Sequence, residues 1–212
     1  MRNRDAKRLF SHETTACAII WALVEIARHP DIQQRLREEI TAARANQAIG
    51  ESDASMINSL PYLHAFVLEL FRLYPSIPLS SKEAKRNLVI CDQFIPKGTQ
   101  IQIPVYAMNR LQDIWGPSAA EFRPERWMKD SQAGETPDSV NKAADLKNLL
   151  TFGYGSRSCP GREFAPRVIK SFLVVLLSAF QFEADGENIE FATSLPTIRP
   201  MHGAPLYVRP IH

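Results

Sequence analysis

The segment Phe152–Gly161 constrains this chain more than any other feature of the sequence. It holds an arginine, a cysteine and three glycines, which are Gly153, Gly155 and Gly161. Glycine permits backbone conformations and close approaches that a Cβ atom prevents. Cys159 stands at the start of a predicted helix, whose free N–H groups and dipole favour a thiolate. Arg157 adds a positive charge two residues earlier, so the segment predicts a tight loop that presents a sulfur beside a cation.

Two interpretations of Cys159 follow from the residues alone. A single thiolate without a second ligand nearby in the sequence suits an axial bond to a metal whose other positions are occupied, and haem iron meets that description. The alternative is a buried structural thiol in a tight turn.

Hydrophobic spacing predicts four main helices. The first covers Ala6–His29, and the second begins at Asp31 after Pro30, with Ile32, Leu36 and Ile40 on one face. The third runs from Leu60 to Leu73 and is ended by Pro75. A strongly apolar helix follows Cys159 and reaches about Phe180. Residues 46–58 are polar and rich in turn-forming residues, and no helix is expected there.

Between the third and last helices the hydrophobic period changes. Alternation over 100–103 predicts a strand, and Ile95–Gly98 predicts a turn that connects it to a preceding strand at Val89–Phe94. Residues 109–144 are rich in Pro, Asp, Gly and Ser, which predicts a long irregular meander, and loops of this length are usually functional. Residues 189–209 predict a terminal hairpin. The order of elements indicates an α+β fold that is mainly α.

Composition excludes several classes of function. With 25 basic and 23 acidic residues the formal charge is +2, which leaves no basic surplus for a dedicated nucleic-acid-binding protein. The three cysteines are Cys17, Cys91 and Cys159, which form no CxxC pair and predict neither a disulfide framework nor a zinc site. No apolar run approaches the ~18 residues that span a bilayer. The N-terminus has no apolar core of a signal peptide, so we expect a soluble or peripheral chain.

The cysteine segment matches every fixed position of Phe-Gly-x-Gly-x-Arg-x-Cys-x-Gly, and in this the sequence resembles the cytochrome P450 family. The resemblance implies the C-terminal part of that fold: the end of the central helix, further helices, a small sheet, the meander, the cysteine loop, a final helix and a hairpin. It also implies haem b, an iron protoporphyrin, with the thiolate of Cys159 as metal ligand. The residues that the resemblance assigns to cofactor binding are Phe152, Gly153, Gly155, Arg157, Cys159, Gly161 and Lys82.

Two further motifs support the resemblance. Glu69 and Arg72 are three residues apart on an apolar helix, and Phe122–Trp127 matches the family signature Phe-x-Pro-Glu-Arg-Phe/Trp. The resemblance implies that Glu69, Arg72 and Arg126 form a charged triad that holds the meander against the core. The alternative for Glu69 and Arg72 is a surface ion pair of little consequence.

The segment Ser11–Thr15 resembles the oxygen-activation segment of the central helix in this family. The resemblance implies catalytic roles for Thr14, which would hold bound oxygen and its water, and for Glu13, which would link that place to solvent for proton delivery. A polar helical stretch with a solvated Glu13 is the alternative. Phe10 and Ser11 replace the usual Ala and Gly, and two explanations are open: the bulk of Phe10 crowds the pocket, or Met1 is not the native start.

Two more positions depart from the family pattern. Lys82 stands where an arginine usually reaches a haem propionate, and an ammonium lacks the bidentate fork of a guanidinium. Asn109 replaces a common histidine in Tyr106–Arg110. Arg157, Arg162, Arg167 and Lys170 predict a basic face, which the resemblance assigns to docking an acidic reductase.

The resemblance extends over about Leu9 to Arg209 but accounts for less than half of a usual family member. We therefore expect residues 1–212 to be one partial domain, with the N-terminal half and its membrane anchor absent and apolar helix faces exposed. The resemblance implies a haem-thiolate monooxygenase that oxidises a small lipophilic substrate with dioxygen and electrons from an NADPH-dependent reductase. It also implies the cytosolic face of the endoplasmic reticulum membrane; without an anchor, the chain as given is expected to be cytoplasmic. The alternative is a truncated, non-catalytic remnant or misannotated fragment of such an enzyme.

Overall fold

The computed structural model describes residues 3–47, 50, 52–128, 148–186, 191–192, 197–201 and 203–211. For residues 3–11 and 191–192 it describes the backbone alone. The predicted crowding by Phe10 and the replacement at Ser11 therefore lie outside the described side chains.

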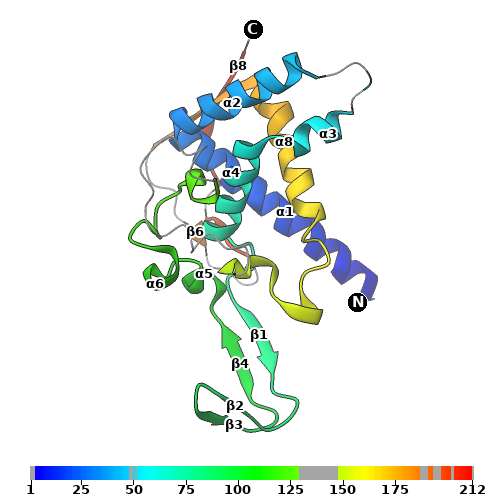
Figure 1. Cartoon of the computed structure of the whole chain (residues 1–212), viewed down its shortest axis with the longest axis vertical. Helices are drawn as coiled ribbons and strands as arrows, with labels where there is room; N and C mark the ends of the chain where they lie inside the picture. The colour runs from blue at the N-terminus through cyan, green and yellow to red at the C-terminus, as the bar shows by residue number, and fades with distance from the viewer. Residues whose placement is uncertain are drawn as a thin grey trace.

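Four long helices form the body of the molecule (Figure 1). They are α1 (Asn3–Arg28), α2 (Pro30–Ala45), α4 (Pro61–Leu73) and α8 (Phe164–Ala179), and each contacts the other three. The predicted helices are thus confirmed to within a few residues, except at the start of the last one. Pro30 and Pro61 each occupy the first turn of a helix, where the missing N–H removes no intrahelical bond.

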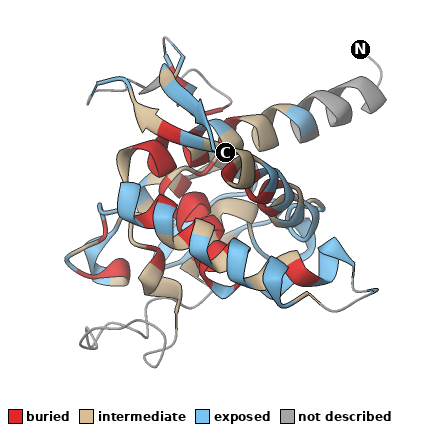
Figure 2. Cartoon of the chain, turned by 90° about the horizontal axis from the view of Figure 1, so that it is seen from above, coloured by how far each residue is buried: buried red, intermediate tan, exposed pale blue. Residues whose placement is uncertain are grey.

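The core lies where these four helices meet. Trp21, Leu36, Phe66 and Leu173, one residue from each helix, are all at most 1% exposed and belong to one hydrophobic cluster. Viewed from above, the buried residues concentrate along the helix sides that face one another (Figure 2). The helices therefore provide the rigid frame on which the connecting segments are arranged.

One helix was not predicted. Within the polar stretch 46–58, α3 (Asp53–Asn58) forms six residues of helix, and the Ser52 hydroxyl accepts a hydrogen bond from the backbone N–H of Ser55. Met56 anchors it in the core. A serine cap and a single buried residue stabilise a helix too short to show a hydrophobic period.

The strands after α4 pair differently from the prediction. β1 (Ser80–Glu83) pairs antiparallel with β4 (Gln100–Ile103), with Ser80 opposite Ile103. Between them the predicted strand Val89–Phe94 is wrong: it is a small hairpin of β2 (Leu88–Ile90) and β3 (Gln93–Ile95). Cys91 and Asp92 make its turn with φ angles of 47° and 60°, and two consecutive left-handed residues reverse the chain.

The described part of the meander contains α5 (Val105–Met108), α6 (Gln112–Trp115) and the 3₁₀ turn η1 (Pro124–Trp127). Its continuation through residue 144 lies outside the described residues. Two 3₁₀ turns, η3 (Leu150–Phe152) and η4 (Gly155–Arg157), shape the loop before α8.

The predicted terminal hairpin is wrong in its pairing. β8 (Leu206–Pro210) pairs with β5 (Phe180–Ala184), which follows α8 directly, whereas β7 (Arg199–Pro200) pairs with β6 (Phe191–Ala192). The strand at the end of the chain thus returns to α8. The α+β, mainly α class is confirmed.

Candidate functional site

The cysteine loop is closed by its own backbone. The N–H of Cys159 donates to the carbonyl of Phe152 at 2.8 Å, which joins the two ends of the loop. Gly153 and Gly155 have φ angles of 66° and 73°, in the left-handed region that favours glycine. The Phe152 ring packs edge-on against Phe71 of α4, with centroids 4.8 Å apart. The loop therefore has a fixed base on α4.

The relation of Cys159 to the following helix differs from the prediction. α8 begins at Phe164, so the cysteine lies one turn before it, and its N–H is already used by Phe152. The prediction that a Cβ atom would be excluded at Gly161 is also not supported, because a Cβ atom built there meets Cys159 Sγ at 3.7 Å, an ordinary contact. Neither the helix dipole at Cys159 nor a steric need for glycine at residue 161 is supported by this geometry.

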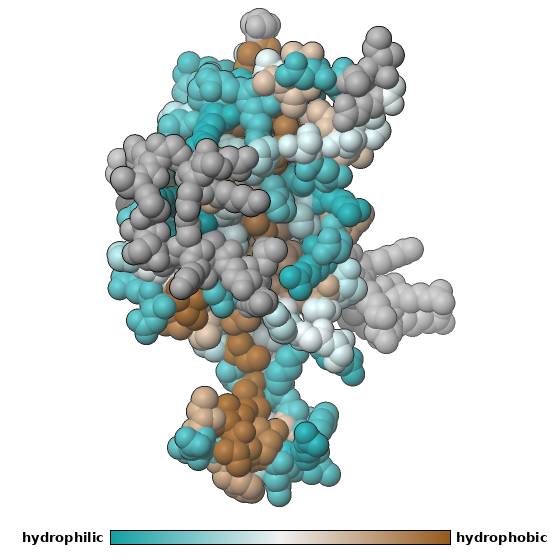
Figure 3. Space-filling view, in the orientation of Figure 1, coloured by the Kyte–Doolittle hydropathy of each residue, from teal (hydrophilic) through white to brown (hydrophobic). Residues whose placement is uncertain are grey.

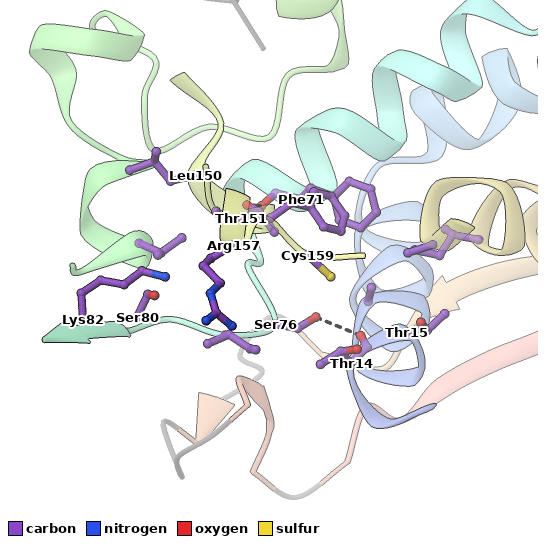
Figure 4. A pocket seen from close by; sticks show the side chains of 17 residues that line it. Thr14, Thr15, Phe71, Ser76, Ser80, Lys82, Leu150, Thr151, Arg157 and Cys159 are labelled. Carbon is purple, nitrogen blue, oxygen red and sulfur yellow. Dashed lines mark hydrogen bonds between the residues drawn. The ribbon is translucent and has the colours of Figure 1, made fainter. Parts of the chain in front are cut away.

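Cys159 lines a cavity of about 210 Å³. Its wall is assembled from α1, α4, β1 and the cysteine loop, through Thr14, Thr15, Phe71, Lys82, Arg157 and Cys159. In the view of Figure 4, Lys82 and Arg157 lie at one end and Thr14 and Thr15 at the other, with the Cys159 sulfur between them. Ala18, Val105 and Ile169 add apolar wall. The cavity thus combines a thiol, two cations, hydroxyl groups and an apolar lining.

Of the two predicted catalytic residues, Thr14 lies at the cavity and Glu13 does not. Thr14 lines the cavity, and its carbonyl accepts a hydrogen bond from the Ser76 hydroxyl at 2.9 Å (Figure 4). The Glu13 carboxylate accepts a hydrogen bond from the Thr197 hydroxyl at 3.0 Å and is not among the residues that line the cavity. The alternative of a solvated Glu13 does not account for this contact, because the carboxylate has a protein partner.

A buried charged network joins α4 to the meander. Glu69 and Arg72 are both fully buried, and Arg72 donates two hydrogen bonds to the Glu69 carboxylate at 2.7 and 2.8 Å. Arg126 Nε lies 3.3 Å from Glu69 Oε1. The structure thus brings together the predicted triad, and the surface-pair alternative is wrong.

The remaining donors of the triad hold meander carbonyls. Arg72 donates to the carbonyls of Asn109, Ala119 and Glu121, at 2.6 to 2.9 Å. Arg126 donates to the carbonyls of Trp115 and Ser118 at 2.9 and 2.8 Å. Because each of these three charged side chains has several partners, the desolvation of the triad is compensated.

A second clamp on the meander was missed by sequence reasoning. Glu125, next to Arg126, accepts hydrogen bonds from Arg35 of α2 and from the Tyr62 hydroxyl of α4, both at 2.9 Å. The Arg35 guanidinium also lies 4.0 Å from the centre of the Tyr62 ring. Tyr62 is 27 positions from Arg35 and 63 from Glu125, and no local pattern links the three residues.

The predicted basic face is divided in two by burial. Arg162 and Arg167 are exposed and line a second cavity of about 370 Å³ between α4 and α8. Lys170 is 5% exposed, and its ammonium donates to Asn58 of α3 at 3.3 Å. Burial lowers the pKa of Lys170, and the nearby Arg167 lowers it further. Lys170 therefore lies at the buried wall of this cavity, against α3, whereas Arg162 and Arg167 are surface charges.

No described helix has the length and apolar character needed to cross a membrane. No three His, Cys, Asp or Glu side chains gather as metal ligands in that part of the chain.

Comparison with known proteins places these features in a family. The model of the family "Cytochrome P450" matches residues 10–201. The chain is 39% identical to cytochrome P450 monooxygenase sphH of Aspergillus fumigatus over 81% of this chain and 31% of that protein. It is 35% identical to monooxygenase claU of Ampulloclitocybe clavipes over 95% and 40%, and 37% identical to cytochrome P450 3A12 of the dog, Canis lupus familiaris, over 81% and 32%. This chain, which spans well under half the length of these relatives, therefore belongs to the cytochrome P450 family.

Proposed function

We propose that this chain carries the haem-binding portion of a haem-thiolate monooxygenase that oxidises a small lipophilic substrate with dioxygen. The observation that carries the proposal is the meeting of Cys159, Thr14 and two cations in one cavity between α1, α4 and the cysteine loop. The named monooxygenases among its relatives support the reaction class.

The donor set of the cavity fits a haem b group. Cys159 offers the soft sulfur that haem iron accepts as an axial ligand, and Phe71, Ala18 and Ile169 offer an apolar surface for a macrocycle. Arg157 and Lys82 offer positive charge for the propionate carboxylates. When bound, haem iron supplies the redox chemistry that activates dioxygen.

The chain's own contribution to the reaction is the management of protons. Thr14 presents a hydroxyl at the cavity, where it can donate a hydrogen bond to oxygen or hold a water molecule. Glu13 lies beside it on α1 and is held by Thr197, so we assign it the supply of protons to Thr14 from outside the cavity.

Haem binding tests the proposed cofactor and its ligand. We expect the chain to bind haem with a spectrum typical of sulfur ligation, and Cys159→Ser to lose that spectrum. Cys91→Ser is the matched control, because Cys91 is also exposed but lies in the β2–β3 turn. A wild-type chain that binds no haem would support the alternative of a non-catalytic remnant, and the exposed Phe172 and Val175 on α8 are the observation that favours that alternative.

Coupling of electron use to product tests Thr14 in a haem-loaded, reductase-supported protein. We expect Thr14→Ala to consume NADPH while forming several-fold less product, and Thr14→Ser, which keeps the hydroxyl, to retain coupling. Equal coupling in Thr14→Ala and wild type would contradict the role proposed for the Thr14 hydroxyl.

The domain, the redox partner and the localisation of the whole protein are proposed from the same family assignment. We propose residues 1–212 as one partial P450 domain, because a single hydrophobic cluster includes residues from α1 to the β8 strand. Exposed Arg162 and Arg167 support docking of an acidic, NADPH-dependent reductase. For the whole protein, family membership supports the cytosolic face of the endoplasmic reticulum membrane.

A further inference from the structure

The Asn109 side chain is fully buried and uses all its hydrogen-bonding groups between three segments. Its Nδ2 donates to the carbonyl of Arg72 on α4 and to the Thr151 hydroxyl, both at 3.0 Å. Its Oδ1 accepts from the backbone N–H of Leu150 at 3.4 Å. Its own carbonyl accepts from Arg72 Nη1 at 2.9 Å. Asn109 thus joins the buried triad to Leu150 and Thr151, the two residues that precede the cysteine loop.

Thr151 continues this network to α4. Its hydroxyl accepts from Asn109 and donates to the carbonyl of Phe71, so both roles of the hydroxyl are used. The next residue, Phe152, packs on Phe71 and accepts the Cys159 N–H through its carbonyl. The Asn109–Thr151 contact is therefore linked to the cysteine through Phe152 and a single hydrogen bond.

Among the described residues, the rest of the loop is held by short-range backbone hydrogen bonds, such as that from the Ser158 N–H to the Gly155 carbonyl at 3.0 Å. Residues 154–157 are exposed, and Gly153 and Gly155 add no side chains that pack. The position of the sulfur is therefore set at the base of the loop, where Thr151 and Phe152 contact α4 and the end of α5. Among the described residues of this base, Asn109 supplies contacts to both Leu150 and Thr151.

We propose that Asn109, through Thr151, is a positioning residue that holds the Cys159 sulfur in the place where it ligates haem iron. This inference rests on the proposed function. The amide is suited to the role because Nδ2 can donate twice while Oδ1 accepts. An isosteric carboxylate would leave the Arg72 carbonyl without its donor, and it could bond Thr151 only if the hydroxyl turned its proton away from the Phe71 carbonyl.

Four variants distinguish a positioning role toward Cys159 from a general loss of stability. Thr151→Val removes the hydroxyl while keeping the shape, and Thr151→Ser retains it. Asn109→Asp removes both donors at constant size. Leu36→Ala, in the core of α2 far from the loop, serves as a control for destabilisation alone.

The first readout is hydrogen exchange in the haem-free chain. We expect the Cys159 amide to exchange roughly tenfold faster in Thr151→Val and Asn109→Asp, with the amides of α2 near their wild-type rates. Thr151→Ser should lie within about twofold of wild type at Cys159.

The second readout is the Soret band of the haem-loaded, ferrous, carbon monoxide-bound protein. Thr151→Val and Asn109→Asp should shift a large fraction of the protein from the thiolate-type band to the band of sulfur-free ligation, whereas Thr151→Ser and Leu36→Ala should not. Unchanged exchange and an unchanged band in both donor-loss variants would overturn the positioning role while leaving haem binding by the wild type intact. Faster exchange throughout α2, in step with Cys159, would also overturn it. A wild type without the thiolate band would overturn both this role and the proposed function.

Discussion

At the scale of single residues, the buried Glu69 carboxylate accepts five hydrogen bonds, as many as the Arg72 guanidinium donates. It accepts hydrogen bonds from Arg72, from Arg126, from the Trp127 indole and from the backbone N–H of Arg123. Burial removes the hydration of a charged group, and these donors compensate the carboxylate for that loss. The Glu69 carboxylate is therefore one of the points at which α4 holds the meander.

Arg126→Met tests this dependence. The change leaves Glu69 with less compensation and leaves the carbonyls of Trp115 and Ser118 without their donor. We expect a loss of about 3–5 kcal/mol in the free energy of unfolding, measured by urea denaturation. Arg126→Lys retains the charge but not the planar fork of the guanidinium, so its free energy of unfolding should lie between those of wild type and Arg126→Met. A loss below about 1 kcal/mol in Arg126→Met would mean that Arg126 is dispensable to the network.

At the scale of elements, α4 is capped by a side chain from another helix. The Glu39 carboxylate of α2 accepts the backbone N–H groups of Tyr62 and Leu63 at 2.7 and 2.9 Å, in the first turn of α4. A carboxylate at this end satisfies free donors and meets the positive end of the helix dipole. Burial nevertheless raises the pKa of Glu39 above its ordinary value of 4.5, because desolvation exceeds these favourable contacts.

The raised pKa predicts a pH dependence. Because the folded state holds the proton of Glu39 more tightly than the unfolded state, this residue's contribution to stability is present below pH 4.5 and is lost as pH rises through the folded pKa. We expect Glu39→Gln, which does not titrate, to gain stability relative to wild type as pH increases over that window. Denaturation at several pH values measures the difference. A constant difference between the two proteins would contradict the prediction.

The β2–β3 turn offers a second element to test. Cys91 and Asp92 adopt left-handed φ angles without being glycine, and that conformation costs free energy in L-residues. Asparagine followed by glycine is the pair that suits such a turn best. The double change Cys91→Asn and Asp92→Gly should therefore raise the free energy of unfolding by about 1 kcal/mol.

Thermal denaturation checks this turn, with Gly98→Ala as the opposite case. Gly98 has a φ of 90° and open space around it, so alanine there strains the backbone without a clash. It should lower stability while the double change raises it. No increase in the double variant would show that the turn is held by contacts other than its own backbone.

Local patterns predicted the long elements well and the short ones poorly. α1, α2 and α4 span several turns with apolar residues at helical spacing, and their proline boundaries are readable in the sequence. The strand predicted over Val89–Phe94 instead turns back at Cys91 and Asp92, which carry no strong turn signal. α3 has a single buried residue, Met56. β8 pairs with β5, which is distant in the sequence, and not with the strand that precedes it. Short elements take their form from contacts that a local window does not contain.

The candidate site divides in the same way. The motif around Cys159 predicted roles for that cysteine and for Arg157, and family resemblance predicted roles for Thr14 and Lys82. All four side chains line one cavity, and the predicted triad is formed. The contact of Asn109 with Thr151 crosses 42 positions, and that of Glu13 with Thr197 crosses 184. Such pairs depend on how the helices pack, so the sequence alone did not indicate them.

At the scale of the whole molecule, several large apolar side chains lie on the surface of the described residues. On α8, Phe164, Phe172 and Val175 are more than half exposed. Val89 and Phe94 form part of the apolar end at the β2–β3 hairpin, which is prominent in Figure 3. The chain covers 31 to 40% of the length of the relatives compared above. A packed four-helix core beneath these surfaces still holds the cysteine loop and its cavity together.

Whether this core suffices for cofactor chemistry is decided by the ferrous–carbon monoxide spectrum of the purified chain after reconstitution with haem. We predict the red-shifted Soret band that thiolate ligation produces, present in wild type and in Cys91→Ser, and absent in Cys159→Ser. A chain that takes up haem without that band, or a Cys159→Ser variant that retains it, would contradict the assignment of Cys159 as the ligand.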